Sequence, residues 1–115
     1  MADDDTIFDK ILRGEIPCDR VYEDEWVLCF RDINPQAPVH AVVIPKKKAR
    51  DVGELCALAP DFVGGYMAGI VKAAQRLGLE GGYRVVFNTG KDAQQSVAYV
   101  HAHILGGRVL GWPPG

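Results

Sequence analysis

The chain has 115 residues, of which 48% are hydrophobic and 24% are charged, and its formal net charge is −2. This composition is typical of one globular domain, long enough to bury roughly two-thirds of its unfolded surface, and it excludes a disordered chain. Basic residues are dispersed apart from Lys46-Lys47-Lys48, and apolar runs stay far below the ~20 residues of a membrane helix. We therefore expect a single domain over residues 1–115, with neither a membrane nor a specific nucleic acid as partner.

The N-terminus and the cysteines bear on the compartment. The segment Met1-Ala2-Asp3-Asp4-Asp5 is acidic, the opposite of a signal or transit peptide. Cys18, Cys29 and Cys56 are odd in number and form no C-x-x-C pair, so neither a disulfide framework nor a thiolate zinc site is indicated. We expect reduced thiols and a protein of the cytoplasm, or of the cytoplasm and the nucleus.

The first predicted element is a short helix. Asp5 or Thr6 can cap its start, and apolar residues recur at helical spacing over residues 7–12. Gly14 then ends the helix.

A strand-rich region follows. Residues 20–23 and 25–30 are predicted to form a hairpin around Asp24. Residues 32–38 contain two prolines and are therefore expected to be irregular, and residues 40–45 form the next predicted strand.

One long helix is predicted to begin at Pro60 and to end at Gly78. It contains Gly64, Gly65 and Gly69, each of which costs about 1 kcal/mol relative to alanine. Close approach of another backbone, as between two subunits, is one explanation, and tolerated surface glycines are the other.

Two further strands are predicted, over residues 82–88 and 97–105, and the polar loop 89–96 joins them. Strands in two groups, separated by a helix, indicate an α+β fold with a mostly antiparallel sheet.

The last predicted strand contains two of the three histidines. Side chains alternate along a strand, so Tyr99, His101 and His103 share one face. The opposite face is wholly apolar and is expected to be the core face, with Val100, Ala102 and Ile104. The two imidazoles are thus held side by side on a surface that a ligand can reach.

The residues by themselves leave three interpretations of this pair. In the first, one imidazole is a nucleophile and the other its partner. Ser96, Asn88 and the backbone amides of Gln94-Gln95 would then donate to an anionic group such as phosphate.

In the second interpretation, His101 and His103 bind zinc with His40, the remaining histidine, as a further ligand. In the third they are a structural pair without a chemical role. The polar loop, the separate third histidine and the Gly106-Gly107 pair favour an anion-binding pocket.

At this level of detail the chain resembles the histidine triad superfamily and, within it, the branch of histidine triad nucleotide-binding proteins called Hint. The resemblance runs almost from end to end. It rests on Asp5-Thr6-Ile7-Phe8, Gly14-Glu15-Ile16-Pro17, Asp32-Ile33-Asn34-Pro35-Gln36-Ala37-Pro38, Val43-Ile44-Pro45-Lys46-Lys47, Gln95-Ser96-Val97, Leu105-Gly106-Gly107-Arg108 and Trp112-Pro113-Pro114-Gly115.

The resemblance implies a HIT-like α+β fold, with a mostly antiparallel five-stranded sheet, one long helix and one short helix. It implies a homodimer with a continuous ten-stranded sheet and with the long helix at the interface. Each subunit would bind a purine nucleoside monophosphate such as AMP. The implied activity is a purine nucleoside phosphoramidase that needs no cofactor.

The resemblance also implies roles for single residues. His101 would be the nucleophile that attacks the α-phosphorus and forms a nucleotidyl-histidine intermediate. His103 and Asn88 would lie at the phosphate, with backbone donors around Gln94 and Val97.

Other roles are implied around this centre. Ser96 would lie by the leaving group, and His40 would be the auxiliary histidine behind the triad. Asp32 would hold the ribose hydroxyls, and Trp112 would reach toward the site of the partner subunit. The base pocket would be lined by Ile7, Phe8, Ile11, Phe30, Arg31, Ile33 and Asn34.

Periodicity alone gives simpler interpretations of the same residues. Phe8, Phe30 and Ile33 would be core residues, and Asp32 a turn former. Asn88 would end a strand, Ser96 would begin one, and Trp112 would lie in a frayed terminus.

The chain departs from the family pattern at the triad itself. Tyr99 stands at the first histidine position, and Ala98 stands where a tyrosine is usual. If that first residue acts through its carbonyl, tyrosine preserves the role. If its side chain belongs to a proton relay with His40, the relay is cut, although the Tyr99 hydroxyl offers a direct bond to His40.

We expect activity to be retained, at a rate that depends on which role applies. The alternative is a nucleotide-binding interaction module whose catalysis is weak or vestigial because of Tyr99. Thr6 and Asp9 replace the C-x-x-C of the zinc-carrying members, so no structural metal is expected.

Overall fold

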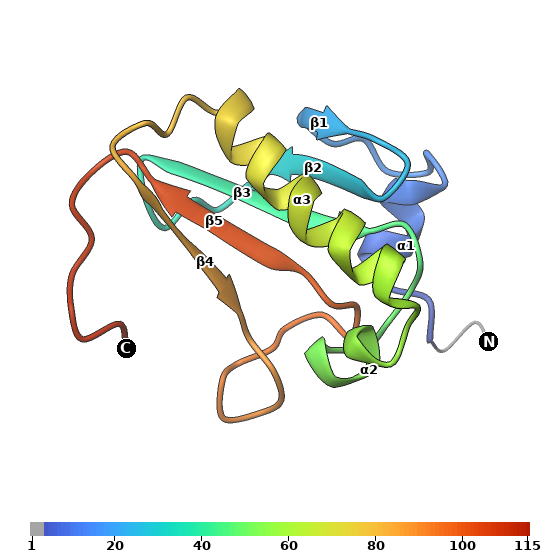
Figure 1. Cartoon of the computed structure of the whole chain (residues 1–115). Coiled ribbons are helices and arrows are strands. Elements are labelled where there is room, and N and C mark those ends of the chain that lie inside the picture. Colours follow the sequence, from blue (N-terminus) through green and yellow to red (C-terminus); the bar gives the residue numbers. More distant parts are fainter. Residues whose placement is uncertain (1–3) are drawn as a thin grey trace.

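The computed structural model describes residues 4–115; residues 1–3 of the acidic N-terminal segment lie outside the described residues. In chain order the elements are α1 (Ile7–Leu12), β1 (Arg20–Glu23), β2 (Val27–Arg31), β3 (Val39–Pro45), α2 (Val52–Cys56), α3 (Pro60–Arg76), β4 (Tyr83–Phe87) and β5 (Ala102–Gly106) (Figure 1). No helix within the described range combines the length and the apolar character needed to cross a membrane.

The strands form one five-stranded sheet in the order β1-β2-β3-β5-β4, and all neighbours are antiparallel. The predicted α+β fold with an antiparallel sheet is therefore confirmed. The strand β5 lies between β3 and β4, so the histidines of the chain's two halves come together in the middle of the sheet.

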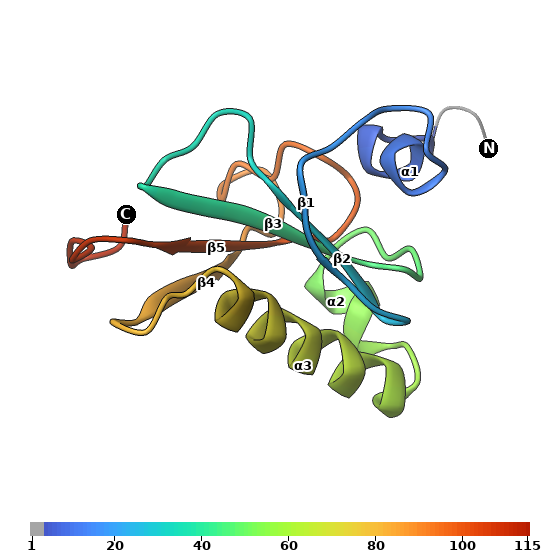
Figure 2. The ribbon, with the colours of Figure 1, turned by 90° about the horizontal axis from the view of Figure 1, so that it is seen from above.

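The two faces of the sheet are covered by different helices. The long helix α3 lies across one face, and α1 lies on the opposite side (Figure 2). Successive strand residues alternate between these two layers, as period-two patterning requires. In β3, Ala41 and Val43 join the α3 core, whereas Val42 and Ile44 pack with Phe8 of α1.

The helix α1 is fixed by a reciprocal cap and by a lysine. The Thr6 hydroxyl accepts from the backbone N–H of Asp9 at 3.3 Å, and the Asp9 carboxylate accepts from the Thr6 N–H at 2.7 Å. Lys48, just after β3, donates to the same carboxylate at 2.9 Å. These contacts tie α1 to the sheet and hold Phe8 against its inner strands.

Two details differ from the sequence predictions. The strand predicted over residues 97–105 begins only at Ala102, because residues 97–101 leave the ladder to follow the polar loop. The short helix α2 was not predicted, since its five residues are too few for a helical period to be visible.

Two of the α3 glycines are explained by packing inside this chain. A Cβ at Gly69 would lie 2.5 Å from a methyl of Val27, and one at Gly65 would overlap the Trp26 ring. A Cβ at Gly64 would meet nothing within 4 Å. The close approach inferred from Gly65 and Gly69 is therefore that of the helix to its own sheet, rather than to another subunit.

This difference predicts opposite effects for two alanine substitutions in α3. Gly69→Ala is expected to lower the free energy of unfolding by about 1–3 kcal/mol, because Val27 is fully buried and cannot move aside. Gly64→Ala is the control and is expected to be neutral or to stabilise by up to about 1 kcal/mol. Urea unfolding monitored by circular dichroism measures both, and equal effects would contradict the assignment.

Candidate active site

A cavity of about 380 Å³ opens on the α1 side of the sheet. This volume is within the usual range for small-molecule sites. Eleven of the residues predicted to bind the nucleotide lie on its wall: Ile7, Phe8, Ile11, Phe30, Arg31, Asp32, Ile33, Ser96, Val97, His101 and His103.

The sequence reasoning missed five other wall residues, which are Ile16, Pro17, Cys18, Asp19 and Val42. Val42 had a readable signal, because it shares the strand face of His40 by period two. The sequence signal for residues 16–19 was weaker: they follow Gly14, whose left-handed backbone conformation turns the chain.

Four of the residues predicted to bind the nucleotide do not line this cavity. Asn34, Gln94 and Trp112 are exposed outside it, and Asn88 is half-buried just after β4. Their predicted roles stay predictions. Asn88 directly follows Phe87, which pairs with Ala102 at the start of β5.

The chemistry of His101 is set by a backbone carbonyl. Its Nδ1 lies 2.8 Å from the carbonyl oxygen of Tyr99. A carbonyl only accepts, so a neutral His101 carries its proton on Nδ1 and keeps the lone pair of Nε2 free. The ring is only 5% exposed, packs edge-on to Phe8 with centroids 5.0 Å apart, and lines the cavity.

A second chain of bonds sets the protons of the other two imidazoles. The backbone N–H of Gln36 donates to His40 Nδ1 at 3.0 Å, which leaves the proton of a neutral His40 on Nε2. That Nε2 lies 2.8 Å from His103 Nδ1, which must then accept. The proton of His103 is consequently on Nε2, so His103 is a hydrogen-bond donor.

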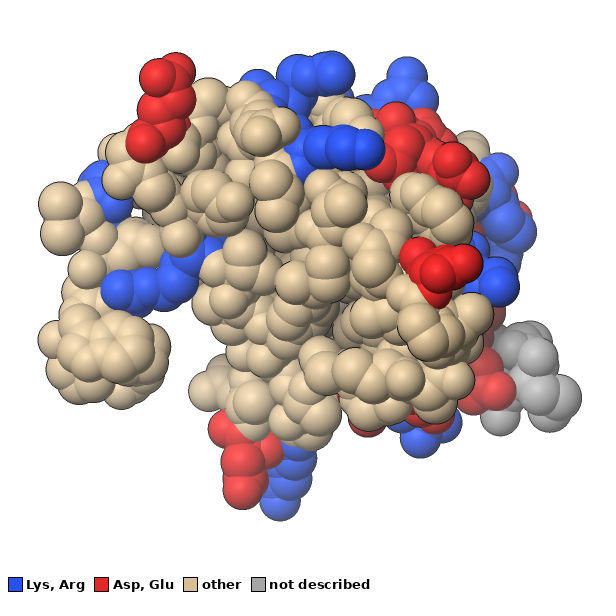
Figure 3. Space-filling view, viewed as in Figure 1, with Lys and Arg blue, Asp and Glu red and all other residues tan. Residues whose placement is uncertain are grey.

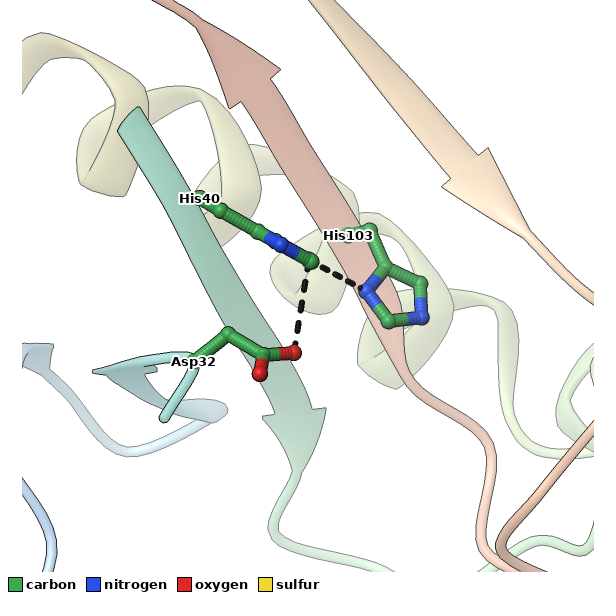
Figure 4. Close-up of side chains that lie close together, drawn as sticks. All are labelled: Asp32, His40 and His103. Atoms are coloured by element: carbon green, nitrogen blue, oxygen red, sulfur yellow. Dashed lines mark hydrogen bonds and ion pairs between the residues drawn. The ribbon is translucent and has the colours of Figure 1, made fainter. Parts of the chain in front are cut away.

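Asp32 completes this cluster. One carboxylate oxygen lies 3.4 Å from His40 Nε2, and the other accepts from the backbone N–H of Asn34 at 2.8 Å. Figure 4 shows His40 between Asp32 and His103, which come from different segments of the chain. The predicted position of His40 behind the triad thus corresponds to a direct contact with His103.

Burial disfavours the charged forms of His40 and His103. It lowers the pKa of His103 to about 4, helped by the neighbouring His101 and His40 and opposed by Asp32. Burial also lowers the pKa of His40, again against the pull of Asp32. Near neutral pH, His103 therefore donates as a neutral ring and not as an imidazolium.

The same cluster has the composition of a metal site. Ligand atoms of Asp32, His40 and His103 lie within 4.8 Å of one another, a different set from the His40, His101 and His103 considered from sequence. The Gln36 N–H argues against zinc here, because it holds the proton of His40 on the very nitrogen that would ligate. The expectation of no metal stays a prediction with this physical support.

The structure contradicts the alternative in which the Tyr99 hydroxyl bonds directly to His40. Its hydroxyl donates to the carbonyl oxygen of Pro45 at 2.6 Å and makes no bond to His40. His40 is already engaged by Gln36 and His103. The Tyr99 ring is buried in the layer below the cavity, and its carbonyl is the part that touches the site.

The polar loop is ordered by Gln95. Its side chain accepts from the Gly90 N–H at 3.0 Å and donates to the carbonyls of Arg50 and Val97 at 2.7 and 3.0 Å. Gln94 takes a left-handed backbone conformation, with φ of 59°. This turn delivers Ser96 and Val97 to the cavity wall.

Comparisons with known proteins agree with this architecture. A model of the HIT domain family matches residues 13–110. The 14 kDa zinc-binding protein of Zea mays is 52% identical over 117 residues, covering 100% of this chain and 91% of that protein. An uncharacterized HIT-like protein of Synechococcus elongatus is 49% identical, covering 97% of this chain and 98% of that protein.

Solved structures give the same result. A HIT family hydrolase from Legionella pneumophila matches with a TM-score of 0.86 at 43% identity, covering 96% of this chain and 100% of that one. A histidine triad nucleotide-binding protein from Candida albicans matches with a TM-score of 0.79 at 29% identity, covering 96% of this chain and 85% of that one.

The lowered histidine pKa values predict how stability depends on pH. In the unfolded chain these histidines take up protons near pH 6.5, whereas folded His103 takes one up only near pH 4. The unfolded state thus binds more protons, so the free energy of unfolding falls as the pH drops from about 6.5 toward 4. Urea unfolding between pH 7 and pH 5 measures this fall in the free energy of unfolding at pH values above those at which most carboxylates titrate.

His103→Asn removes one of the two histidines with a lowered pKa. The free energy of unfolding of this variant is therefore expected to depend less on pH. The titration of His103 followed by NMR gives its pKa directly. A free energy of unfolding that does not change between pH 7 and pH 5 in the unmodified chain would contradict the assignment.

Proposed function

Since this chain belongs to the HIT domain family, we propose that it is a purine nucleoside phosphoramidase of the Hint branch, a hydrolase that cleaves the P–N bond of AMP-amine compounds. The observation that supports this most is the state of His101. Its Nδ1–H is bonded to the Tyr99 carbonyl, and its unprotonated Nε2 belongs to a ring on the cavity wall. A nucleophile for phosphorus needs that arrangement.

In the first half-reaction, Nε2 of His101 attacks the α-phosphorus, the N–P bond forms and the P–N bond to the amine breaks. The departing amine takes one proton from the hydroxyl of Ser96 on the cavity wall, and Ser96 regains a proton from solvent. The phosphorylated ring of His101 becomes cationic, and its Nδ1–H bond to the Tyr99 carbonyl becomes stronger.

In the second half-reaction, water attacks the phosphorus, loses a proton, and His101 departs as a neutral ring. In both halves negative charge grows on the phosphate oxygens. The Nε2–H of His103 is a donor for that charge, and its partner His40 holds the proton in place. Backbone amides near Val97 and the side chain of Asn88 are the further proposed donors.

The nucleoside would occupy the rest of the cavity. Phe8, Phe30 and Ile11 form an apolar wall suited to a purine ring, and Asp32 is the acceptor for the ribose hydroxyls. The charged pair of Arg31 and Asp19 borders the same wall, with Nε and Oδ2 3.8 Å apart.

The mechanism predicts a covalent intermediate. Single-turnover reaction with an AMP-amine substrate is expected to give a nucleotidylated protein detectable by mass spectrometry. His101→Asn should lose this species and slow turnover by roughly 10⁴-fold or more while still binding AMP. If the His101→Asn variant turns over substrate as fast as the original chain, His101 is not the nucleophile.

The same experiment separates the proposal from the alternative of an interaction module. AMP binding without a covalent species and without turnover in the unmodified chain would favour the module. The retained bond between His101 and the Tyr99 carbonyl favours the enzyme.

We also propose that the protein works as a homodimer. The strand β4 is an edge of the sheet, and Met67, Val71 and Tyr83 expose large apolar side chains. Figure 3 shows that the α3 side is largely uncharged at its centre. Trp112 is 78% exposed, and the guanidinium carbon of Arg84 in β4 lies over its ring, 5.5 Å from the ring centroid. We propose that in this dimer Trp112 of one subunit reaches toward the site of the other.

Sedimentation equilibrium is expected to give the mass of two chains at micromolar concentration. Val71→Glu should shift the protein toward the monomer, because it buries a charge in the proposed interface. Lys10→Glu on α1, on the other side of the sheet, is the control. A monomeric unmodified chain would rule out the dimer.

A further inference from the structure

The carbonyl that orients His101 lies in a segment without strand pairing. Ladder hydrogen bonds begin at Ala102, whereas Tyr99 and Val100 come just before it. A carbonyl in an unpaired segment is not positioned by the sheet, and yet it must stay within hydrogen-bond distance of the nucleophile's ring. Something else must fix the peptide group between Tyr99 and Val100.

Two hydrogen bonds do so in the described chain, one from each side of this peptide. The Val100 N–H donates to the carbonyl of Ala49 at 2.7 Å. The Tyr99 hydroxyl donates to the carbonyl of Pro45, the last residue of β3, at 2.6 Å. Both bonds reach the region where the chain leaves β3, so the peptide is tied to the neighbouring strand in place of a ladder.

The Tyr99 ring is buried and contacted by two neighbouring side chains. It is 1% exposed, and its ring packs edge-on against Phe8 with centroids 6.2 Å apart. The ammonium group of Lys48 lies 5.9 Å from the centroid of the same ring. Because few rotatable bonds separate the Tyr99 hydroxyl from the Tyr99 carbonyl, a ring that is fixed relative to β3 also restricts where that carbonyl can lie.

We propose that Tyr99 is a positioning residue for the nucleophile, and that its hydroxyl bond to Pro45 replaces the work of the first triad histidine. This inference rests on the proposed function of His101. The side chain is buried in the cluster around Phe8 and does not line the cavity, so it acts only through the Tyr99 carbonyl and His101 Nδ1.

Two hydroxyl-free variants test the proposal. Tyr99→Phe keeps the ring and removes only the anchor. Small displacements of catalytic groups can cost about 100-fold in rate, so kcat is expected to fall between about 10-fold and 100-fold with KM little changed. Tyr99→His restores the residue usual in the family and is expected to give no gain, because it also lacks the bond to Pro45.

The chain offers a matched control in Tyr66. This residue is also fully buried, and its hydroxyl donates at 2.7 Å to the carbonyl of Val43, which is on the same strand as Pro45. Tyr66 lies on the α3 side of the sheet, remote from the cavity wall. Tyr66→Phe is expected to lose similar stability and to leave kcat unchanged.

A second measurement does not need turnover. Long-range ¹H–¹⁵N NMR of the histidine rings reports which nitrogen of His101 carries the proton. Tyr99→Phe should shift a measurable fraction of His101 away from the Nδ1–H form, whereas Tyr66→Phe should not.

The outcomes separate the two proposals. An unmodified chain without turnover overturns the proposed function, while the NMR comparison still decides the anchor. If Tyr99→Phe keeps the kcat of the original chain and the same His101 tautomer, the positioning role of Tyr99 is refuted, while the proposed function stands. A marked gain in Tyr99→His also refutes the positioning role, because the missing imidazole would then be what limits the rate.

Discussion

The site depends on hydrogen bonds between backbone groups and imidazoles. The carbonyl of Tyr99 fixes the proton of His101 on Nδ1, and the N–H of Gln36 fixes that of His40 on Nε2, from which the proton of His103 follows. A main-chain group cannot change its donor or acceptor character with pH. Two imidazoles with opposite roles can therefore lie side by side, because main-chain groups fix which nitrogen of each ring accepts and which donates.

The sheet supplies the distances that these bonds need. In the pairing of β3 with β5, Val42 faces His103 and His40 faces Leu105, so His40 and His103 are diagonal neighbours on one face. The other face of the same strands is buried against α3, and a shift of β5 by one residue would turn His103 toward that core. The packing of α3 and the chemistry of the cavity thus fix the same register.

The exchange of histidine for tyrosine at position 99 shows which part of a residue a site uses. The carbonyl is common to all residues, and it is the group that contacts His101. The side chain is free to change if it keeps the carbonyl in place, which here means filling the layer against Phe8 and bonding to Pro45. A triad pattern read by side chain alone would count this position as lost.

The sequence by itself determined the helices α1 and α3, the five strands, the shared face of Tyr99, His101 and His103, and most of the cavity wall. The elements and the shared face follow from periodicity and from short-range signals such as the Thr6 cap, which the chain carries locally. The cavity wall was implied only by the resemblance to the histidine triad family, since periodicity alone made Phe8, Phe30 and Ile33 core residues. Only the tertiary structure decided that β5 starts at Ala102, that Gly69 packs on Val27 of the same chain, and that Tyr99 bonds to Pro45. Those facts, like the pairing of His40 with His103, join residues far apart in the chain, and period and spacing hold no information on such distances.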